Sequence, residues 1–354
     1  MRYTLVLSLL MLSTFAFAAV EEVAPGELLS RYWLEDPLTI STTFGVPNHV
    51  FSLSADGSSS AQNSIDYSPP QATDFTLAIG YGQFNFSWKQ PLPQSSGSKN
   101  QFGRSTYNDF CFEWGRNRFA TSLYHQNFNG FYTDLNGNTG NFARIGSGGS
   151  NDSSSPSRDT PSSFAVPQDI VKRGDISTKH YGAIVWYAFP LVGENAQAFQ
   201  LSFRSIIDTP SPGFNFDLVT NLFYDYATVN GSEPFVPAKR SSSFGRSARL
   251  QAVETHSGGT GIGFAASYAF KYLFVDGMFL YGGGAQRQHL SFSDDQNWNT
   301  SYVDNVNMKT GVGFRMNKHQ AGLNFWVNSM GSKVSDVRFT SSNMAVELGY
   351  QITI

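Results

Sequence analysis

The last twelve residues, Asn343 to Ile354, constrain the fold more than any other stretch of the chain. Apolar and polar side chains alternate through them without a break, which is the pattern of a β-strand with one apolar and one polar face. The apolar face consists of Met344, Val346, Leu348, Tyr350, Ile352 and Ile354. The sequence therefore predicts that the chain ends in a strand whose apolar face reaches the terminal carboxylate.

The same alternation recurs along the chain, and its apolar face is repeatedly aromatic. Phe84 to Trp88 and Phe110 to Trp114 each place three aromatic rings on one side. Only 14% of the residues are charged, against roughly a quarter in a typical soluble domain. After the N-terminal segment no run of about 18 apolar residues occurs, so no helical membrane span is predicted. Closed β-structure is then the remaining way to cross a bilayer, because lipid cannot satisfy backbone amides.

We therefore predict an all-β fold, a transmembrane antiparallel up-and-down β-barrel of about 14 strands, with a range of about 12 to 16. Each strand is expected to have about 10 residues, enough to cross a bilayer when tilted. A soluble β-sandwich also fits the alternation and stays open as an alternative. The recurrent aromatic face and the polar opposite face favour the barrel, whose terminal strand is similar to those of bacterial outer-membrane barrels.

The N-terminus has the features of a secretory signal peptide, predicted to span residues 1–18. Arg2 provides the positive start, Leu5 to Phe17 the apolar stretch, and Ala16-Phe17-Ala18 a small-x-small cleavage site. The single cysteine, Cys111, lies far from this site, which argues against a lipoprotein signal and an internal disulfide framework. We expect export followed by insertion into the outer membrane.

Three further segments are predicted after the signal peptide. Residues 19–37 form a periplasmic N-terminal arm, or alternatively a plug inside the barrel, and residues 38–354 form the barrel. Residues 136–176 form a long external loop, since the centre of this range, Gly146 to Ser163, is rich in Gly and Ser and has no periodicity. The expected partners are outer-membrane lipid, lipopolysaccharide and the barrel-assembly machinery. With 24 basic and 27 acidic residues, the chain is not expected to bind nucleic acid; its oligomeric state is left open.

The stretch from Asp74 to Asp134 carries the most specific likeness to a known family. It contains a glycine-rich strand ending in Gly80-Tyr81-Gly82 and a second strand ending in Lys89-Gln90-Pro91. It also contains a Tyr-x-Gln-x-x-x-Gly-Phe-Tyr pattern formed by Tyr124, Gln126, Gly130, Phe131 and Tyr132. These motifs resemble those of an uncharacterised family of gram-negative outer-membrane proteins, catalogued as domain of unknown function 4421. The resemblance implies a barrel and no assigned activity. The chain departs from such barrels at its end, where Ile354 replaces the usual aromatic residue.

Charged residues on the polar faces of the predicted strands form the one candidate site. We hypothesise that cations and anions face one another across the lumen, because charges partly removed from water persist when they are paired. Mixed signs predict a closed, salt-bridged interior or a narrow pore of weak selectivity, whereas a ring of one sign would have predicted ion selection. The cluster comprises Lys89, Asp109, Glu113, Arg118, Arg204, Asp217, Asp225, Lys309, Arg315 and Glu347.

Catalytic, metal and cofactor sites are not predicted. His125-Gln126-Asn127 lacks the serine that a lipid-hydrolase motif needs for an activated nucleophile. The six histidines are dispersed, Asp294-Asp295 is better explained as part of a solvated loop than as a Ca²⁺ site, and no Lys-Ser/Thr follows Gly282-Gly283-Gly284. The first interpretation is therefore a non-enzymatic outer-membrane barrel, with a channel or transporter of small solutes preferred. The alternatives are a surface-interaction protein acting through its loops and, less favoured, a lipid hydrolase.

Overall fold

A computed structural model describes residues 38–55, 63–70, 73–116, 118–135, 170–193, 196, 198–199 and 212–354. The predicted signal peptide, the arm or plug at 19–37 and the Gly/Ser-rich centre of the external loop lie outside the described residues. Within the described part of the chain, no helix is both long and apolar enough to span a membrane.

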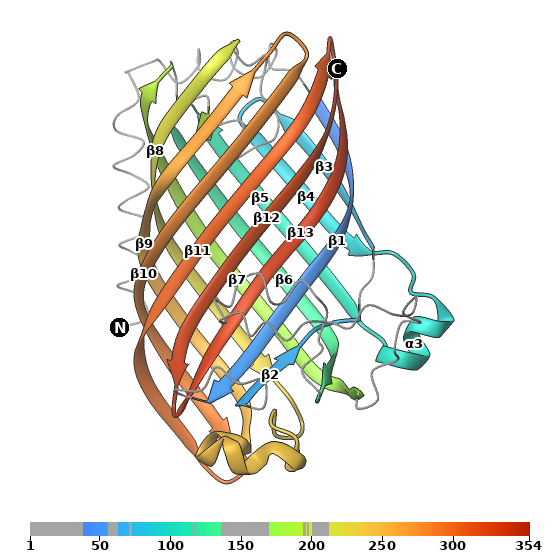
Figure 1. Ribbon diagram of the computed structural model, residues 1–354, viewed down its shortest axis with the longest axis vertical. Helices are drawn as coiled ribbons and strands as arrows, with labels where there is room; N and C mark the ends of the chain where they lie inside the picture. The colour runs from blue at the N-terminus through green and yellow to red at the C-terminus, as the bar shows by residue number, and fades with distance from the viewer. Residues whose placement is uncertain are drawn as a thin grey trace, which may run out of the picture.

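Thirteen strands form a single antiparallel sheet in the part of the chain that the structure describes, a number within the predicted range. Figure 1 shows them tilted around a common axis as a barrel. The strands are β1 (Leu38–Ala55), β2 (Ser64–Tyr67), β3 (Asp74–Tyr81), β4 (Phe84–Pro91), β5 (Thr106–Arg116), β6 (Phe119–Asp134), β7 (Ile170–Val192), β8 (Gly213–Asn230), β9 (Leu250–Ala269), β10 (Leu273–Phe292), β11 (Gln296–Met316), β12 (His319–Val334) and β13 (Val337–Thr353).

The terminal strand closes the ring. β13 pairs with β1 from Thr39 opposite Thr353 to Ala55 opposite Val337, so the first and last strands of the barrel are neighbours. Leu348, one of the predicted apolar residues, is 61% exposed on the outside of the ring. The predicted barrel is thereby confirmed and the sandwich is excluded, because one sheet closes on itself and leaves its aromatic rows on the outer face.

The two ends of the barrel differ in their connections. The turns after β3, β5, β9 and β11 are short and lie at the end where β1 begins and β13 finishes (Figure 1). The opposite end carries α3 (Ser96–Phe102) after β4, and η3 (Ala238–Ser243) and η4 (Gly245–Arg249) after β8. Outer-membrane barrels have short periplasmic turns and longer external loops. The end of the barrel at which β1 begins and β13 finishes is therefore periplasmic.

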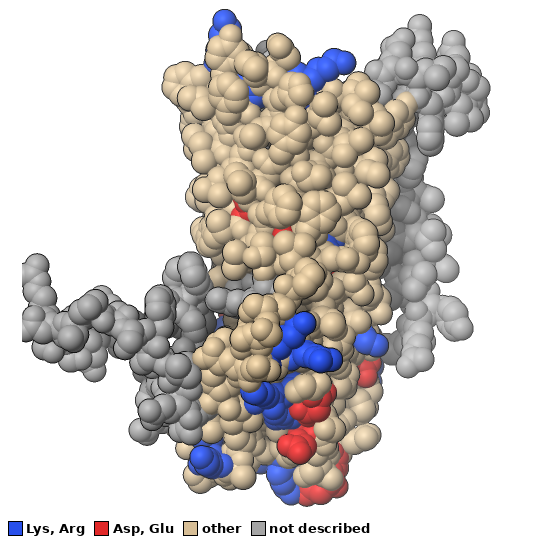
Figure 2. Space-filling model, turned by 90° about the vertical axis from the view of Figure 1, so that its right-hand side faces the viewer, with Lys and Arg blue, Asp and Glu red and all other residues tan. Residues whose placement is uncertain are grey.

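The outer surface divides into an apolar band and a charged extracellular part. Figure 2 shows a wall almost without Lys, Arg, Asp or Glu, and a gathering of these residues toward the extracellular end. Ring pairs mark the edges of the band. His125 stacks on Tyr181 on the extracellular side, and Tyr268 meets Phe270 edge to face on the periplasmic side. Such aromatic girdles flank the lipid-facing wall of membrane barrels.

Several strands are longer than the sequence predicted. β7 has 23 residues and β11 has 21, about twice the 9–11 residues that cross a bilayer. The predicted external loop 136–176 is wrong at its end, because Ile170–Ile176 begins β7, and Ile170–Arg173 pairs with the end of β6. The additional residues extend the strands beyond the apolar band. There the outward-facing side chains are polar, and the alternation of aromatic and polar residues ends.

The set of strands that forms the barrel wall changes near the extracellular edge of the apolar band. β4 ends at Pro91 and β5 begins at Thr106, and Figure 1 shows α3 between them, projecting sideways from the barrel. Beyond this point Ser68, next to β2, pairs directly with Tyr132 of β6. Gly130 lies at the same junction with φ of 83°, and a side chain there would overlap the carbonyl oxygen of Arg104. Glycine is needed here because both the backbone angle and the close approach exclude a Cβ atom.

Candidate functional site: the lumen

The lumen is filled in layers along the barrel axis. Strand alternation turns one side chain in two inward, and the register places these side chains at successive depths. Along β1, Thr43 lies near the periplasmic end, His49 lies deeper and Phe51 and Leu53 lie at the extracellular end. The three layers are an open periplasmic cavity, a polar layer and an aromatic plug.

The aromatic plug closes the extracellular end. Phe235, Val236 and Phe244 of the β8–β9 connection are almost completely buried against inward residues of the strands. The hydroxyl of Tyr67 donates a hydrogen bond to the carbonyl oxygen of Phe235. The strand residues of this layer are Phe51, Leu53, Ile65, Tyr67, Tyr107, Phe128, Phe131, Ile176, Val229, Leu250, Val253, Leu290, Phe292, Val334, Val337 and Phe339. Because the contacts are apolar and close-packed, this layer excludes water.

Polar contacts hold the β8–β9 connection, which contributes to the plug, in its place. The guanidinium of Arg173 donates to the carbonyl oxygens of Pro234 and Glu233, at 2.8 and 2.9 Å, and pairs with Asp175. The hydroxyl of Ser247, at the other end of the connection, donates to Asp336 in the β12–β13 turn. The plug is therefore fixed to two separate parts of the rim.

The contact between Ser247 and Asp336 predicts a pH dependence. Burial raises the pKa of the Asp336 carboxyl, but hydrogen bonds from Ser247, Ser335 and the backbone outweigh it, so that the pKa lies below its ordinary value. A carboxyl with a lowered folded-state pKa stabilises the protein above its unfolded pKa, and this stability is lost as the pH falls through the folded pKa. We expect Ser247→Ala to move the midpoint of acid unfolding, followed by circular dichroism, to higher pH. An unchanged midpoint would contradict the role of this contact.

A charged cluster forms the periplasmic side of the polar layer. The ammonium of Lys89 lies 2.6 Å from Glu347 and 3.5 Å from Asp74, and all three side chains are largely buried. The hydroxyl of Tyr107 donates to Asp74 at 2.7 Å. The β3–β4 hairpin supplies Asp74 and Lys89, and β13 supplies Glu347, which lies far from both in the sequence. Partial burial makes an unpaired charge costly, so the cluster fixes these strands relative to one another.

Histidines form the extracellular side of the polar layer. His49 hydrogen-bonds to Asn343, and its ring lies 5.5 Å from the ring of His180. His180 lies 3.9 Å from Asp225, which accepts a 2.8 Å hydrogen bond from Tyr124. The polar layer thus continues across the lumen from β1 and β13 to β7 and β8.

Several residues of the predicted charge cluster lie in or beside this layer. Asp109 is the ladder partner of Lys89 and accepts a hydrogen bond from Gln126 at 3.0 Å. Glu113 accepts one from Asn85 at 3.0 Å. Lys309 and Arg315 lie half-buried on the face of β11 that also carries the buried Asn305 and Asn307. The structure brings Lys89 and Glu347 together as an ion pair, with Asp109 beside them.

Other members of that cluster do not fit the prediction. Arg118 is exposed in the turn between β5 and β6, because β6 begins one residue later than the alternation suggested. Asp217 is buried but accepts the backbone N–H of Phe199 at 2.8 Å, so a peptide group takes the place of the expected cation. Arg204 lies outside the described residues.

The residues of the family-like motif contribute to several parts of this site. Tyr124 and Gln126 contact Asp225 and Asp109 in the polar layer, and Phe131 belongs to the plug. Gly130 allows the approach of the β4–β5 connection, and the ring of Tyr132 packs on Phe102 of α3 at 4.8 Å. The residues of the motif therefore lie where the contents of the lumen meet the barrel wall.

An open cavity occupies one side of the periplasmic half. It has a volume of about 130 Å³, and Glu347 of the charged cluster is one of its lining residues. Its inward polar lining includes Ser41, Thr43, Asn85, Asn324 and Gln351. On the other side of the lumen, Ala196, Ala198 and Phe199 of the β7–β8 connection pack against Trp186 and other apolar inward residues. These residues fill the other side of the lumen, so the open cross-section of the periplasmic half is limited to the cavity.

Sequence reasoning missed much of the polar layer. His49, Asp74, Tyr107, His180 and Asn343 were not singled out, although each lies on the inward face by strand alternation. Their proximity depends on ring closure, which a single strand does not reveal. Within the described residues no group of three or more His, Cys, Asp or Glu side chains is placed to hold a metal ion.

Comparisons with known proteins identify neither a family nor an activity for the chain. No family model matches the chain, so the resemblance to domain of unknown function 4421 stays a prediction. No curated protein matches it in sequence. Among solved structures, the chain is similar to the outer membrane protease OmpT from Escherichia coli, with 8% identity, a TM-score of 0.40, and coverage of 91% of this chain and 98% of that chain.

Two further solved structures belong to different functional classes. The Pseudomonas putida toluene transporter TodX shares 7% identity, with a TM-score of 0.28 and coverage of 90% of each chain. The attachment invasion locus protein Ail of Yersinia pestis shares 7% identity, with a TM-score of 0.18 and coverage of 90% of this chain and 99% of that chain. A protease, a transporter and an attachment protein share no activity, and at these values the likeness does not select one.

Proposed function

We propose that the protein is a closed outer-membrane conduit for small solutes. One observation carries the proposal: a largely polar cavity in the periplasmic half reaches Glu347, the partner of Lys89, inside a barrel whose extracellular end is filled by the aromatic plug. A barrel that only anchored surface loops would not need a polar cavity with charges buried at its end. The lumen therefore has the form of a channel held shut.

The charged cluster suits small, weakly selected solutes. Lys89 is flanked by Asp74, Asp109 and Glu347, so the formal charges of these four residues are mixed in sign and sum to −2. A ring of one sign would favour ions of the opposite sign. We expect neutral polar molecules and small ions to pass once the plug is displaced, with a weak preference for cations.

Electrical recording in planar bilayers tests the proposal. The purified full chain should show almost no current at rest, and a variant without the aromatic plug should show a steady current. A folded plug-less barrel that stays silent would overturn the conduit.

A second candidate function is contact with another surface. The strands extend beyond the apolar band, and ion pairs such as Arg246 with Asp295 at 2.5 Å and Arg338 with Asp304 at 2.5 Å order the extracellular part. A charged, ordered rim is suited to a protein partner. Deletion of residues 146–163 should abolish surface binding if this function applies, and the same deletion in the plug-less barrel should leave its current unchanged.

A further inference from the structure

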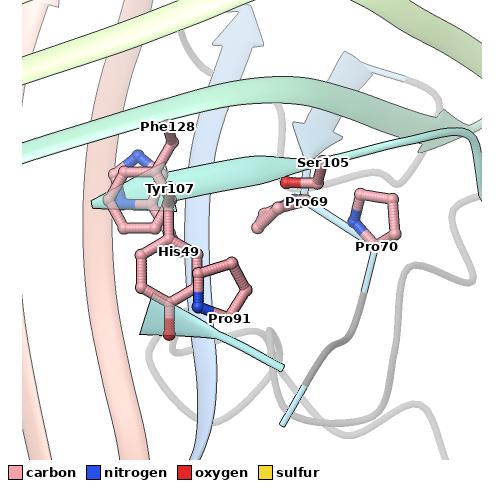
Figure 3. Close-up of a pocket in the computed structure, with 7 residues that line it drawn as sticks. All are labelled: His49, Pro69, Pro70, Pro91, Ser105, Tyr107 and Phe128. Carbon is pink, nitrogen blue, oxygen red and sulfur yellow. The ribbon is translucent and has the colours of Figure 1, made fainter. Parts of the chain in front are cut away.

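The cavity in the periplasmic half of the lumen is much larger than the void beside the aromatic plug. That void, lined by His49, Tyr107 and Phe128 among others, has room for about one water molecule (Figure 3). The periplasmic cavity has a volume of about 130 Å³. A protein cavity of about 150 Å³ can hold a ring the size of benzene. The periplasmic cavity therefore has room for one small ring-shaped solute.

A row of three glycines explains why this space is empty. Gly313 of β11, Gly322 of β12 and Gly349 of β13 are successive ladder partners, so they lie side by side across three strands. The three atoms nearest to a Cβ atom built at Gly322 all belong to the backbone of β11. The wall is therefore bare backbone at the centre of this glycine row, where any other residue would place a side chain in the lumen.

Side chains bound the glycine row at its two ends. At the β10 end, the ring of Phe274 lies over Gly313, since a Cβ atom at Gly313 would overlap that ring. At the β1 end, the hydroxyl oxygen of Thr43 lies 3.3 Å from the position of a Cβ atom at Gly349. Phe274 and Thr43 both line the cavity. The cavity thus extends from an aromatic ring to a hydroxyl group.

Amide and hydroxyl groups lie along the two sides of the glycine row. On the side toward the charged cluster, Asn324 and Glu347 are ladder partners. On the periplasmic side, Gln320, Gln351 and Ser41 lie opposite one another on three neighbouring strands. Each amide and hydroxyl group can both donate and accept hydrogen bonds. The lining therefore matches a molecule whose own groups do both, as hydroxyl groups do.

The side-chain amide of Gln351 indicates that the cavity takes a ligand. Gln351 is 6% exposed and lines the cavity, and its amide has no hydrogen-bond partner among the described residues. Buried polar groups are normally hydrogen-bonded. A hydroxyl-bearing molecule in the cavity would supply the partner that the described part of the chain does not.

The lining disfavours charged and apolar molecules. Glu347 is the one charged side chain among the described residues of the lining, and its 2.6 Å contact with Lys89 already pairs it. A further charge brought into the cavity would be desolvated without a counter-ion. An apolar molecule would leave the amides unpaired, and a site built to bond hydroxyl groups rejects an analogue without them by about 10⁴-fold or more.

We propose that the cavity binds one neutral monosaccharide, with its C–H face against Phe274 and its hydroxyl groups bonded to Asn324, Gln351 and Ser41. The inference rests on the proposed conduit and names the solute class that the conduit takes. The bare backbone of the glycine row gives the sugar ring a flat surface to lie on. Ser41 and Gln351 are within three residues of the start of β1 and the end of β13, so the site lies next to the periplasmic rim.

Saturation-transfer difference NMR of D-glucose with the full chain in detergent micelles tests the site, because it detects weak binding and requires no transport. The sugar protons should show a saturable signal. Gly349→Leu places a side chain in the cavity and should abolish this signal. Gly277→Leu makes the same change on the outer face of β10, where a Cβ atom meets nothing nearer than 3.8 Å, and should leave the signal as in the wild type.

Two further measurements sharpen the test. D-Glucuronate, which carries a carboxylate in place of the CH₂OH group of D-glucose, should give a much weaker signal. Gln351→Met keeps the size of the side chain and removes its amide, and it should weaken the D-glucose signal. This variant serves if Gly349→Leu does not fold, as judged by heat-modifiable migration on gels.

The outcomes for the site and for the conduit are separate. The saccharide site is overturned if D-glucose gives no saturable signal with the wild type, if the signal persists in the folded cavity variants, or if D-glucuronate binds equally well. The current of the plug-less barrel reports the conduit independently. Current without D-glucose binding overturns the site and leaves the conduit standing, whereas D-glucose binding to a chain whose plug-less barrel is silent overturns the conduit and leaves the site.

Discussion

Replacing Phe235, Val236 and Phe244 by serine should convert a silent barrel into a conducting one. These side chains are almost completely buried in the lumen and are the part of the plug that the β8–β9 connection contributes. Truncating one buried Phe costs about 3–5 kcal/mol, and about 1.4 kcal/mol is a tenfold change in an equilibrium. We therefore expect the open fraction, measured as time-averaged current in planar bilayers, to rise by at least about a hundredfold.

The matched control is Phe102→Ser. Phe102 belongs to α3 and packs on Tyr132 outside the lumen, so its loss should leave the current at the wild-type level. Tyr67→Phe removes only the hydrogen bond to Phe235 and should produce occasional openings. Equal currents from the triple variant and Phe102→Ser, in folded protein, would refute the assignment of the plug.

Lys89→Met should destabilise the barrel more than any other single charge removal in the described lumen. It leaves Glu347 and Asp74 as buried carboxylates without their cation. Removing one partner of a buried ion pair costs about 3–5 kcal/mol, because the remaining charge is uncompensated. We expect a clear fall in the urea midpoint for unfolding from lipid vesicles.

Two further variants distinguish the loss of the buried charge pair from a general loss of stability. Lys239→Met removes an exposed lysine of η3 and should leave the midpoint unchanged. The double variant with Lys89→Met and Glu347→Met removes both partners of the 2.6 Å contact and should recover part of the stability. A midpoint for Lys89→Met equal to that of Lys239→Met would contradict the buried cluster.

The barrel could be predicted from the sequence because the alternation of apolar and polar residues that determines it is a local property of the chain. Alternation at residues 343–354 and in the aromatic strands depends only on neighbours along the chain, and the terminal strand occupies its predicted place. Strand ends were harder to predict, because beyond the membrane the outward residues become polar. This is why Ile170–Ile176 was assigned to a loop.

The candidate site was only partly predictable. Inward charges follow from alternation, which located Lys89 and Glu347, but their pairing needed the closure of β13 on β1. The plug was missed because Phe235 and Phe244 lie in a polar connection without periodicity, where burial depends on a tertiary contact. Arg118 was misplaced because a shift of one residue at a turn moves a side chain from the lumen to solvent.

Thiol labelling along β13 tests the central claim, a water-accessible periplasmic lumen inside a lipid-facing wall, most directly. In a Cys111→Ser background, single cysteines replace Gly349, Gln351, Val346 and Leu348, and the proteoliposomes are treated with a charged maleimide. Cysteines at positions 349 and 351, which line the cavity, should react rapidly. Cysteines at 346 and 348, on the outer face, should react only with a lipid-soluble maleimide. Equal labelling at all four positions, or the reverse alternation, would contradict the account.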